Sequence, residues 1–585
     1  MSTTETVTKN ARKSAKKSQG KVSNQGQQAP LEPAAVPAPS SAPPAAEPEV
    51  PVLQLQGKEV VLPPSPTLKA QTLTFEDVPL EEEYSKVAII GCGFSGIAAS
   101  IAMQDHFKEE DYTVVEGHHE VGGTWYANTY PGCASDIPAP WYSLSTDLNP
   151  NWSKFHPPQA EMGEYLKRVV DQRDIRRHVR FNSRVVKVQW DDDREVWKST
   201  VINRETGRKY VLVSNIVFMG QGILVYPKHY EAPGIRDKFK GRYIHSAEWD
   251  SSIDLKDKNV IVIGNGCSAV QLVPSIAPEV KNVTQLVRSE QWLIPPPGKE
   301  VFASYKKLWS KSNFLMKVFR FLIFLGSESR APMFNARNPL SYFVEKFFTW
   351  KARRHMQNNV PKEYQDIVIP KFRLGCKRMI VDNYYSKALH RENVNLSQDE
   401  IDYVTEHHVH TKAGKTYPAD VIVACTGYDL DIGLNATPVY GRRGACVQER
   451  WKVEGATAYD TVLVDNCPNF FFLVGPNAGT GHSSVIFAIE NEIMYIKKIL
   501  DPVMKGKAHT VEVKSSAYQK WRESVQDALK TTVFGTPYGG CVSWYAKNNV
   551  NYTTYPWSQV YFWWRTKFPN WKDLKYTPVE SKKSV

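Results

Sequence analysis

A glycine-rich turn between two apolar segments constrains this chain more than any other feature of its sequence. The apolar residues 87–90 are followed by Gly91, Gly93 and Gly96, and then by small residues that suit a helix. The first glycine permits a tight turn off a strand, the second lets a ligand approach the backbone, and the third lets helix and strand pack closely. The pattern therefore predicts a strand, a turn and a helix whose first N–H groups can bind a pyrophosphate.

An acidic residue completes this first motif. A second apolar segment, residues 112–115, ends at Glu116, twenty positions after Gly96. A carboxylate at this place can accept hydrogen bonds from the ribose of a dinucleotide. A glycine-rich turn without a ligand is the alternative, and the flanking strand, helix and acid make it the weaker interpretation.

A second glycine motif, GNGCSA at residues 264–269, follows the strand-like residues 260–263. The next expected strand, residues 283–287, ends in Arg288 and Ser289 rather than in an acid. An arginine at this place accommodates a 2′-phosphate, whereas an acid binds a free 2′-hydroxyl. The first motif therefore favours FAD and the second favours NADPH over NADH. A duplicated fold with one empty site is the remaining alternative.

Two such motifs predict an α/β protein with two Rossmann-like dinucleotide-binding domains, and 585 residues leave room for further parts. Residues 184–190, 196–203 and 209–213 alternate as strands do and predict an antiparallel meander. The expected order is a disordered arm (1–80), an FAD-binding part (81–225), an NADPH-binding part (226–300), a helical insertion (301–364), a return to the NADPH-binding domain (365–385), a second FAD-binding part (386–500) and an aromatic-rich closure (501–585).

Composition narrows the function classes. The net charge of +12 is scattered, no nucleic-acid-binding module is recognisable, and the inferred cofactors are polyanions, so we expect no nucleic-acid partner. The first eighty residues are rich in Lys, Pro, Ala and Ser and cannot bury enough apolar surface to fold. Neither a secretory signal nor an apolar run of 18 residues is present, so we expect a cytoplasmic protein without a transmembrane segment.

Three further segments carry expectations about burial. Residues 314–325, FLMKVFRFLIFL, are too few to span a bilayer. We expect a buried or substrate-channel helix there, with a membrane-surface anchor as the weaker alternative. Residues 350–355 are basic and predict a solvated helix face. The aromatic-rich tail is expected to close the fold over the active site rather than bind a membrane.

The eight cysteines contain no CxxC pair and no pair with zinc-ligand spacing, so no metal site is expected. We interpret them as buried free thiols in a reducing compartment. The absence of a close cysteine pair also argues against a dithiol-relay flavoprotein reductase.

Residues 239–250, FKGRYIHSAEWD, match the fingerprint FxGxxxHxxxW(P/D), by which the chain resembles Baeyer–Villiger monooxygenases. Residues 122–132 (GGTWYANTYPG), the Lys377-Arg378 pair and residues 425–429 (CTGYD) also resemble that family. The related flavin-containing monooxygenases usually carry a different aromatic residue at the place of Trp249. Thr129, Ser135 and Pro138 depart from the family pattern, which bears on the shape of the substrate pocket rather than on flavin binding.

The resemblance implies roles for particular residues. Arg378 would stabilise the anion of a flavin C4a-peroxide, and Asp136 would hold that arginine in place. Lys377 and Arg288 would contact the 2′-phosphate, and His245 with Trp249 would lie at the domain connection. The residues expected to contact the two cofactors are Gly91, Gly93, Phe94, Ser95, Gly96, Glu116, Gly123, Thr124, Trp125, Ala134, Ser135, Asp136, Ile137, Tyr142, Val185, Gly264, Asn265, Gly266, Cys267, Ser268, Ala269, Arg288, Ser289, Lys377 and Asn477.

The implied activity is an NADPH- and O₂-dependent oxidation of an apolar ketone to an ester or lactone, with natural-product biosynthesis as one setting. Oxygenation at nitrogen or sulfur is the nearest alternative. It differs in that it uses a protonated rather than an anionic peroxide. An NADPH oxidase or redox-sensing flavoprotein without an organic substrate is an alternative of another class. A non-catalytic interaction protein is the third, and the intact glycine motifs with Arg378 and Asp136 argue against it.

Overall fold

The computed structural model describes residues 80–296, 306, 312–547 and 550–579, and the backbone of residues 52–55 and 58–61. Most of the predicted disordered arm therefore lies outside the described residues. Within it, β1 (Val52–Leu55) and β2 (Lys58–Val61) pair antiparallel, so the expectation of disorder is wrong for this short segment. Val52, Val60 and Val61 are β-branched residues, which favour a strand.

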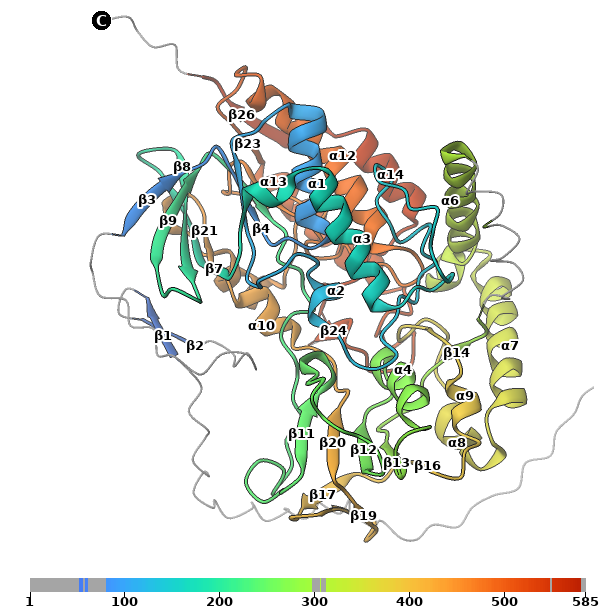
Figure 1. Ribbon diagram of the computed structural model, residues 1–585. Helices are drawn as coiled ribbons and strands as arrows, with labels where there is room; N and C mark the ends of the chain where they lie inside the picture. The colour runs from blue at the N-terminus through green and yellow to red at the C-terminus, as the bar shows by residue number, and fades with distance from the viewer. Residues whose placement is uncertain are drawn as a thin grey trace, which may run out of the picture. The chain divides into compact units, whose positions relative to one another are not determined.

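The first glycine motif lies in a five-stranded parallel sheet with the order β22–β10–β4–β5–β6. All four residues of β4 (Val87–Ile90) are buried, as expected for an inner parallel strand that is covered on both faces. Helix α1 (Phe94–Ala102) packs against α12 (Val485–Met504), which comes from the far end of the chain (Figure 1). The other strands are β5 (Tyr112–Val115), β6 (Val179–Arg180), β10 (Ile216–Met219) and β22 (Phe470–Phe472).

The predicted meander is confirmed. β7 (Ser183–Asp191), β8 (Val196–Asn203) and β9 (Lys209–Ser214) pair antiparallel, close to the expected bounds. β3 (Glu81–Tyr84) and β21 (Val439–Tyr440) add a parallel strand at either edge. The main chain of β7 also contacts β5, because the Ser183 N–H donates to the Glu116 carbonyl at 2.8 Å.

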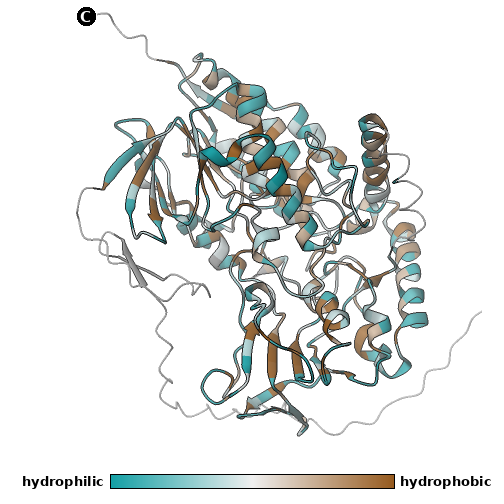
Figure 2. Ribbon diagram, in the orientation of Figure 1, coloured by the Kyte–Doolittle hydropathy of each residue, from teal (hydrophilic) through white to brown (hydrophobic). Residues whose placement is uncertain are grey.

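The second glycine motif lies in another five-stranded parallel sheet, with the order β11–β20–β12–β13–β16. Figure 2 shows these strands as largely hydrophobic, in keeping with a sheet that is covered on both faces. The strands are β11 (Arg242–His245), β12 (Asn259–Ile263), β13 (Asn282–Leu286), β16 (Val394–Ser397) and β20 (Val421–Ala424), and helix α4 (Cys267–Ile276) follows β12.

This second sheet corrects one predicted boundary. Residues 386–500 were expected to belong to the FAD-binding domain, yet β16 pairs with β13 and β20 pairs with β11 and β12. The chain therefore returns to the first sheet only after β20. The local pattern of β20, a buried strand before a glycine, is the same in both domains and does not indicate which sheet it joins.

The helical insertion consists of α6 (Asn313–Glu328) and α7 (Ser341–Asn359). The expected burial of residues 314–325 is wrong for one face of α6, since Phe314 is 71% and Phe321 57% exposed. The opposite face, with Met316 and Phe324, is buried. A helix with apolar residues on all sides buries only the side that packs against its neighbour. The apolar residues on its other side remain exposed. The basic residues Lys351 and Arg354 of α7 are exposed, as predicted.

The C-terminal residues meet their expectation in part. Tyr545 and Tyr555 are buried, whereas Trp564 and Phe568 are more than half exposed.

None of the described helices is both long and apolar enough to cross a membrane. The remaining described elements of four or more residues outside 3₁₀ and π turns are α2 (Thr124–Ala127), α3 (Gln159–Gln172), α8 (Gln365–Val368), α9 (Tyr385–Ala388), α10 (Leu430–Asn435), α11 (Val447–Glu454), α13 (Ser515–Leu529), α14 (Gln559–Lys567), β17 (Ile401–Val404), β18 (His408–Thr411), β23 (Thr510–Val513) and β26 (Leu574–Thr577).

Candidate active site

The first glycine turn has the form that a pyrophosphate site needs. Gly91 leaves β4 with φ of +93°, and a Cβ atom on Gly96 would lie 1.8 Å from the Gly91 carbonyl oxygen. Only glycine allows this approach of helix to strand. Helix α1 begins after Gly93 without a side-chain cap, so its first N–H groups are free to bind an anion. The turn therefore fits the phosphates of FAD.

Glu116 lies at the end of β5, buried and held by hydrogen bonds. Its Oε2 accepts from the Cys92 N–H at 2.7 Å, and its Oε1 accepts from the His118 N–H at 2.9 Å and contacts the His118 Nδ1 at 2.9 Å. A carboxylate offers about four acceptor positions, and three are used here. One position on Oε2 remains for a ribose hydroxyl. Val185 of β7 lies two residues beyond Ser183, which places it beside this strand end.

The second glycine turn is open at its centre. Gly264 has φ of +110°, and a Cβ atom there would lie 2.6 Å from the Cys425 carbonyl oxygen. Gly266, in contrast, has no atom within 4 Å of such a Cβ position, so a ligand can approach the backbone at this point. Asn265 donates from Nδ2 to the Ser289 carbonyl at 2.5 Å and joins the turn to the end of β13. Helix α4 begins at Cys267 without a side-chain cap, as α1 does.

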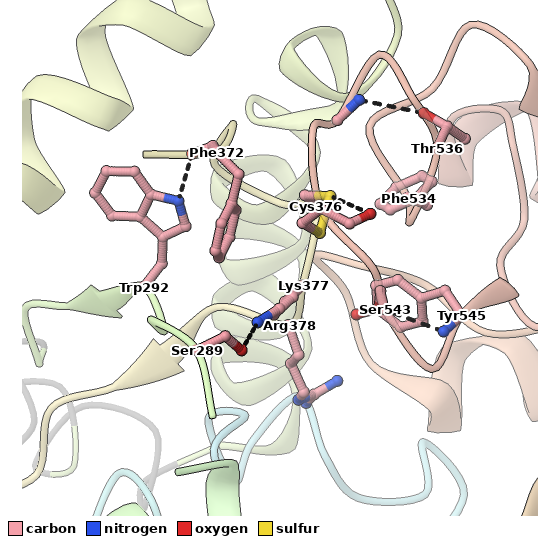
Figure 3. Close-up of a disulfide and its surroundings, with 12 residues drawn as sticks. Ser289, Trp292, Phe372, Cys376, Lys377, Arg378, Phe534, Thr536, Ser543 and Tyr545 are labelled. Carbon is pink, nitrogen blue, oxygen red and sulfur yellow. Dashed lines mark hydrogen bonds between the residues drawn. A yellow bond between two sulfur atoms is a disulfide. The ribbon is translucent and has the colours of Figure 1, made fainter. Parts of the chain in front are cut away.

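Two cations gather where β13 ends. Lys377 donates from Nζ to the Ser289 hydroxyl at 2.6 Å, as Figure 3 shows, and to the Glu290 carbonyl at 3.2 Å. Burial lowers the pKa of Lys377, the charge of Glu290 raises it and the nearby charge of Arg288 lowers it further. Arg288 is exposed. Two cations close together at the end of this strand fit the 2′-phosphate of NADPH.

Arg378 and Asp136 form a bidentate ion pair across 242 residues of chain. The Arg378 Nε donates to Oδ2 and its Nη2 donates to Oδ1 of Asp136, each at 2.7 Å. Burial acts to raise the pKa of Asp136, and the guanidinium holds it below its usual range. The charge of Asp136 raises the pKa of Arg378 well above its ordinary value. Both groups are therefore ionised at any working pH.

A short strand pair positions Arg378. β14 (Leu293–Ile294) pairs in parallel with β15 (Ile380–Val381), and the Ile380 N–H donates to the Trp292 carbonyl at 3.0 Å. The Gln291 side chain also donates to the Arg378 carbonyl. These contacts bring the Lys377-Arg378 pair from the return segment to the second glycine motif.

Three aromatic residues expected to contact the cofactors, Phe94, Trp125 and Tyr142, pack together. The Tyr142 ring meets the rings of Phe94 and Trp125 edge-on, at centroid distances of 5.6 and 5.7 Å. Burial raises the pKa of Tyr142 to about 12, so its hydroxyl remains protonated. Other residues expected to contact the cofactors, Gly123, Thr124, Ala134, Ser135 and Ile137, follow the chain between Gly93 and Tyr142.

Asn477 closes the site from the C-terminal side. Its Nδ2 donates to the carbonyls of Asn551 and Thr554, at 3.0 and 3.1 Å. Its Oδ1 is buried and accepts no hydrogen bond among the described residues. A buried acceptor without a donor is costly, which fits a donor on a bound cofactor.

Two residues near Arg378 were missed by the sequence-based site. Tyr545 is buried beside the guanidinium, and burial raises its pKa to about 12 against the opposing effect of the Arg378 charge. Gln271 of α4 accepts from the Tyr130 hydroxyl at 2.8 Å and donates to the Ala134 carbonyl at 3.0 Å. Gln271 therefore joins the second domain to the loop that leads to Asp136. Neither residue stands in a local motif that announces such contacts.

His245 and Trp249, the remaining fingerprint residues, lie at the end of β11 and just beyond it. His245 is buried, burial lowers its pKa to about 4, and its Nδ1 accepts from the Ala247 N–H at 3.1 Å. Its ring is 6.4 Å from that of Tyr428, whose hydroxyl donates to Asn128 of the first domain at 2.7 Å. The fingerprint thus lies next to a contact between the two domains.

A disulfide joins Cys376 to Cys541, 165 residues apart (Figure 3). The expectation that all eight cysteines are free thiols is therefore wrong for this pair, and the six others are free. The Cα atoms of Cys376 and Cys541 are 6.2 Å apart. Their separation in the sequence gave no indication that the two residues lie close together. The bond ties the segment of Lys377 and Arg378 to the loop that carries Tyr545.

Comparison with known proteins agrees with this geometry. Residues 84–439 match the flavin-binding monooxygenase-like family. A Baeyer–Villiger monooxygenase of Pseudomonas aeruginosa is 30% identical over 82% of this chain and 88% of its own length. A second Baeyer–Villiger monooxygenase, from Streptomyces coelicolor, is 32% identical over 81% of this chain and 88% of its own.

Solved structures share the fold. Cyclohexanone monooxygenase from Rhodococcus sp. Phi1, bound to NADP⁺, has a TM-score of 0.71 with 22% identity and covers 86% of this chain and 100% of that one. A steroid monooxygenase bound to NADP has a TM-score of 0.72 with 22% identity and covers 85% and 100%. The two-domain α/β architecture and the flavin expected from the first motif are confirmed. The chain belongs to the flavin-binding monooxygenases, in the group of the Baeyer–Villiger monooxygenases.

Proposed function

We propose that the protein catalyses the NADPH- and O₂-dependent Baeyer–Villiger oxidation of an apolar ketone to an ester or lactone. The observation that carries this proposal is the Arg378–Asp136 pair, which joins the segment after the first dinucleotide motif to the return segment of the second domain. FAD, which the turn of Gly91 and Gly96 and the carboxylate of Glu116 would hold, would supply hydride uptake from NADPH and activation of O₂ for attack on the ketone carbonyl.

Arg378 supplies a fixed positive charge for that chemistry. A guanidinium carries five N–H donors, and Asp136 takes two of them. Three donors remain to stabilise negative charge on a reacting oxygen. A preorganised cation in a site shielded from water stabilises such charge more strongly than water does. Asp136 acts by orienting the guanidinium and keeping it charged.

The cations at the end of β13 support NADPH as the reductant. Lys377 and Arg288 provide two positive charges for the 2′-phosphate, and Ser289 fixes the position of Lys377. The requirement for NADPH, a reductant made inside cells, supports a cytoplasmic location. Oxidation of ketones in natural-product biosynthesis is a setting in which such an enzyme would act.

The test replaces Arg378 with Ala and follows FAD content, NADPH loss and ester formation over a panel of ketones. FAD should remain bound, while ester formation should fall by about 10²-fold or more, as when a charge-stabilising donor is removed elsewhere. Arg373→Ala is the matched control, because Arg373 lies on the same segment and pairs with Glu345 at 3.2 Å. Unchanged ester formation in Arg378→Ala would refute the assignment of this residue.

The same panel separates the alternative activities. Sulfide or amine oxidation that survives in Arg378→Ala, without ketone oxidation in the wild type, would indicate N- or S-oxygenation. Hydrogen peroxide release equal to NADPH loss with every ketone would indicate an oxidase. A purified protein without flavin would refute the proposed function altogether.

Asp136→Ala tests the orienting carboxylate. FAD should stay bound, and ester formation should fall by about 10–100-fold, the usual effect of removing a group that orients a reactive one. Asp136→Asn, which keeps the shape but removes the charge, should show most of this loss. Loss of FAD from both variants would instead make Asp136 a binding residue.

A further inference from the structure

Within the described residues, α6 and α7 of the helical insertion carry exposed apolar residues, which we together call the insertion face. On α7, Phe343 is 70% exposed and Phe347 and Trp350 are each 56% exposed. They recur at intervals of four and three residues and so form one stripe along the helix. On α6, the exposed apolar residues are Phe314, Val318, Phe321, Leu322 and Leu325. Figure 2 shows α6 as hydrophobic along most of its length.

Contacts on the buried side of α6 fix the orientation of this helix about its axis. Arg320, on the opposite face, is buried and donates from Nη1 to the carbonyls of Pro140 and Ser143, at 2.6 and 2.8 Å. Phe324 packs against Trp141 at a ring distance of 5.6 Å. Turning the apolar residues inward would break these contacts and expose Met316 and Phe324, which are now buried. The outer face is therefore a stable surface of the fold.

The exposed charges of α6 and α7 themselves have one sign. Lys317, Lys346, Lys351 and Arg354 are exposed, and none of them belongs to an ion pair in the described part of the chain. Residues 312–359 contain two carboxylates, Glu328 and Glu345, and both are turned inward. Glu328 pairs with His482 at 3.1 Å and Glu345 pairs with Arg373 at 3.2 Å.

Helix α14 begins next to the end of α6. The Gln559 N–H, at the start of α14, donates to Glu328 at the end of α6 at 2.9 Å, so the two helix ends adjoin. Trp564 of α14 is 56% exposed. Tryptophan is enriched where protein meets the interface of a bilayer, because its ring is apolar and its N–H is polar.

We infer that the insertion face docks the protein onto the surface of an anionic lipid bilayer. Exposed aromatic residues flanked by lysine and arginine insert among the headgroups while the cations meet anionic lipid. A second copy of this chain fits less well, because a two-fold interface would set the same basic residues against one another. The docked helix α6 would then lie between the bilayer and the segment of Trp141, which follows Asp136 in the chain.

The test measures co-sedimentation of the full-length protein with vesicles of phosphatidylcholine, with and without phosphatidylglycerol. The variant Phe343→Ser/Phe347→Ser/Trp350→Ser should bind the anionic vesicles about tenfold or more weakly, since three apolar contacts are lost. Lys346→Glu/Lys351→Glu should weaken binding to anionic vesicles by about tenfold and leave binding to phosphatidylcholine unchanged. All these side chains are exposed, so the variants should keep their fold, which circular dichroism and melting check.

The controls make the same chemical changes elsewhere on the surface. Val453→Ser removes an apolar side chain that is 87% exposed, and Lys256→Glu/Lys258→Glu reverses two exposed charges. Both should bind vesicles as the wild type does. The inference is overturned if the wild type binds neither vesicle or if the insertion-face variants bind as tightly as the controls. Insertion-face variants that bind as tightly as the controls would indicate binding through the Lys-rich N-terminal residues. The inference is also overturned if the wild type binds no vesicles and light scattering shows a dimer that the triple variant does not form. The insertion face would then mediate self-association.

Discussion

Asp136, which is partly buried, and Glu492, which is fully buried, are two carboxyl groups that the fold stabilises in opposite ways. Asp136 is ionised because Arg378 faces it. Glu492 has no cation as a partner among the described residues and accepts from the Thr461 hydroxyl and the Val474 N–H, each at 2.8 Å. Burial raises its pKa to about 8. Val474 has φ of +56° and leads directly to Gly475 and Asn477, so Glu492 supports the loop that carries Asn477.

Glu492 makes stability depend on pH. Its pKa is higher in the folded protein than the ordinary value of 4.5, so the folded state binds the proton more tightly than the unfolded state. Stability should therefore fall as pH rises from about 4.5 to about 8 and level off above that. Glu492→Gln, which can still accept from Val474, should remove this decline and be more stable than the wild type by a few kcal/mol at high pH.

Thermal melting over this pH range checks the prediction. Glu164→Gln, at a side chain that is 72% exposed, is the control and should keep the slope of the wild type. The same slope in Glu492→Gln would show that another group causes the pH dependence.

Among the structural elements, the return segment before β15 depends on contacts from three parts of the chain. β14 pairs with β15, Ser289 holds Lys377, and the disulfide joins Cys376 to Cys541. A turn with so few regular hydrogen bonds of its own needs such ties to keep Lys377 and Arg378 in place.

The disulfide should contribute to stability. Cys376→Ser/Cys541→Ser should lower the free energy of unfolding by about 2–5 kcal/mol, because the bond closes a loop of 165 residues in the unfolded chain. The wild type in reductant should melt as the double variant does, and the variant should not respond to reductant. Cys446→Ser, at a free thiol, is the control and should melt as the wild type. Eight reactive thiols in the unreduced, unfolded wild type would contradict the bond.

Across the whole molecule, the two dinucleotide domains meet where α4 contacts the loop before Asp136. Gln271 bridges the Tyr130 hydroxyl and the Ala134 carbonyl, and a Cβ atom on Gly132 would lie 2.4 Å from the Gln271 carbonyl. Arg378 crosses the same boundary to reach Asp136. The site therefore forms only when both domains are held together.

Removing the Gln271 bridge should loosen that arrangement without unfolding the protein. In Gln271→Ala, NADPH should still be oxidised, while the ester formed per NADPH should fall by about two- to tenfold and peroxide should rise, because three hydrogen bonds to the loop are lost. Parallel assays of NADPH, ester and peroxide measure this ratio. Gln172→Ala, an exposed residue at the end of α3, is the control. An unchanged ratio in Gln271→Ala would contradict a role of this bridge in closing the site.

Much of the fold could be predicted from local patterns. The strand over residues 421–424 and the meander from β7 to β9 lie where their alternation and apolar runs place them. The glycine turns could also be predicted, because a tight turn and a close helix–strand approach require glycine at particular positions. These features depend on neighbours a few residues away, and the amino-acid order contains them directly.

Contacts between distant segments could not be predicted in this way. The membership of β20 in the second sheet, the disulfide of Cys376 and the Gln271 bridge each join residues with no common local pattern. The exposed face of α6 is of the same kind, since apolar residues on every side of a helix do not reveal which side is covered. The residues alone thus decided which cofactors the chain can bind, because backbone geometry and charge at single turns suffice for that. Tertiary structure decided how Arg378 meets Asp136 and which surface stays bare, because both depend on packing between segments hundreds of residues apart.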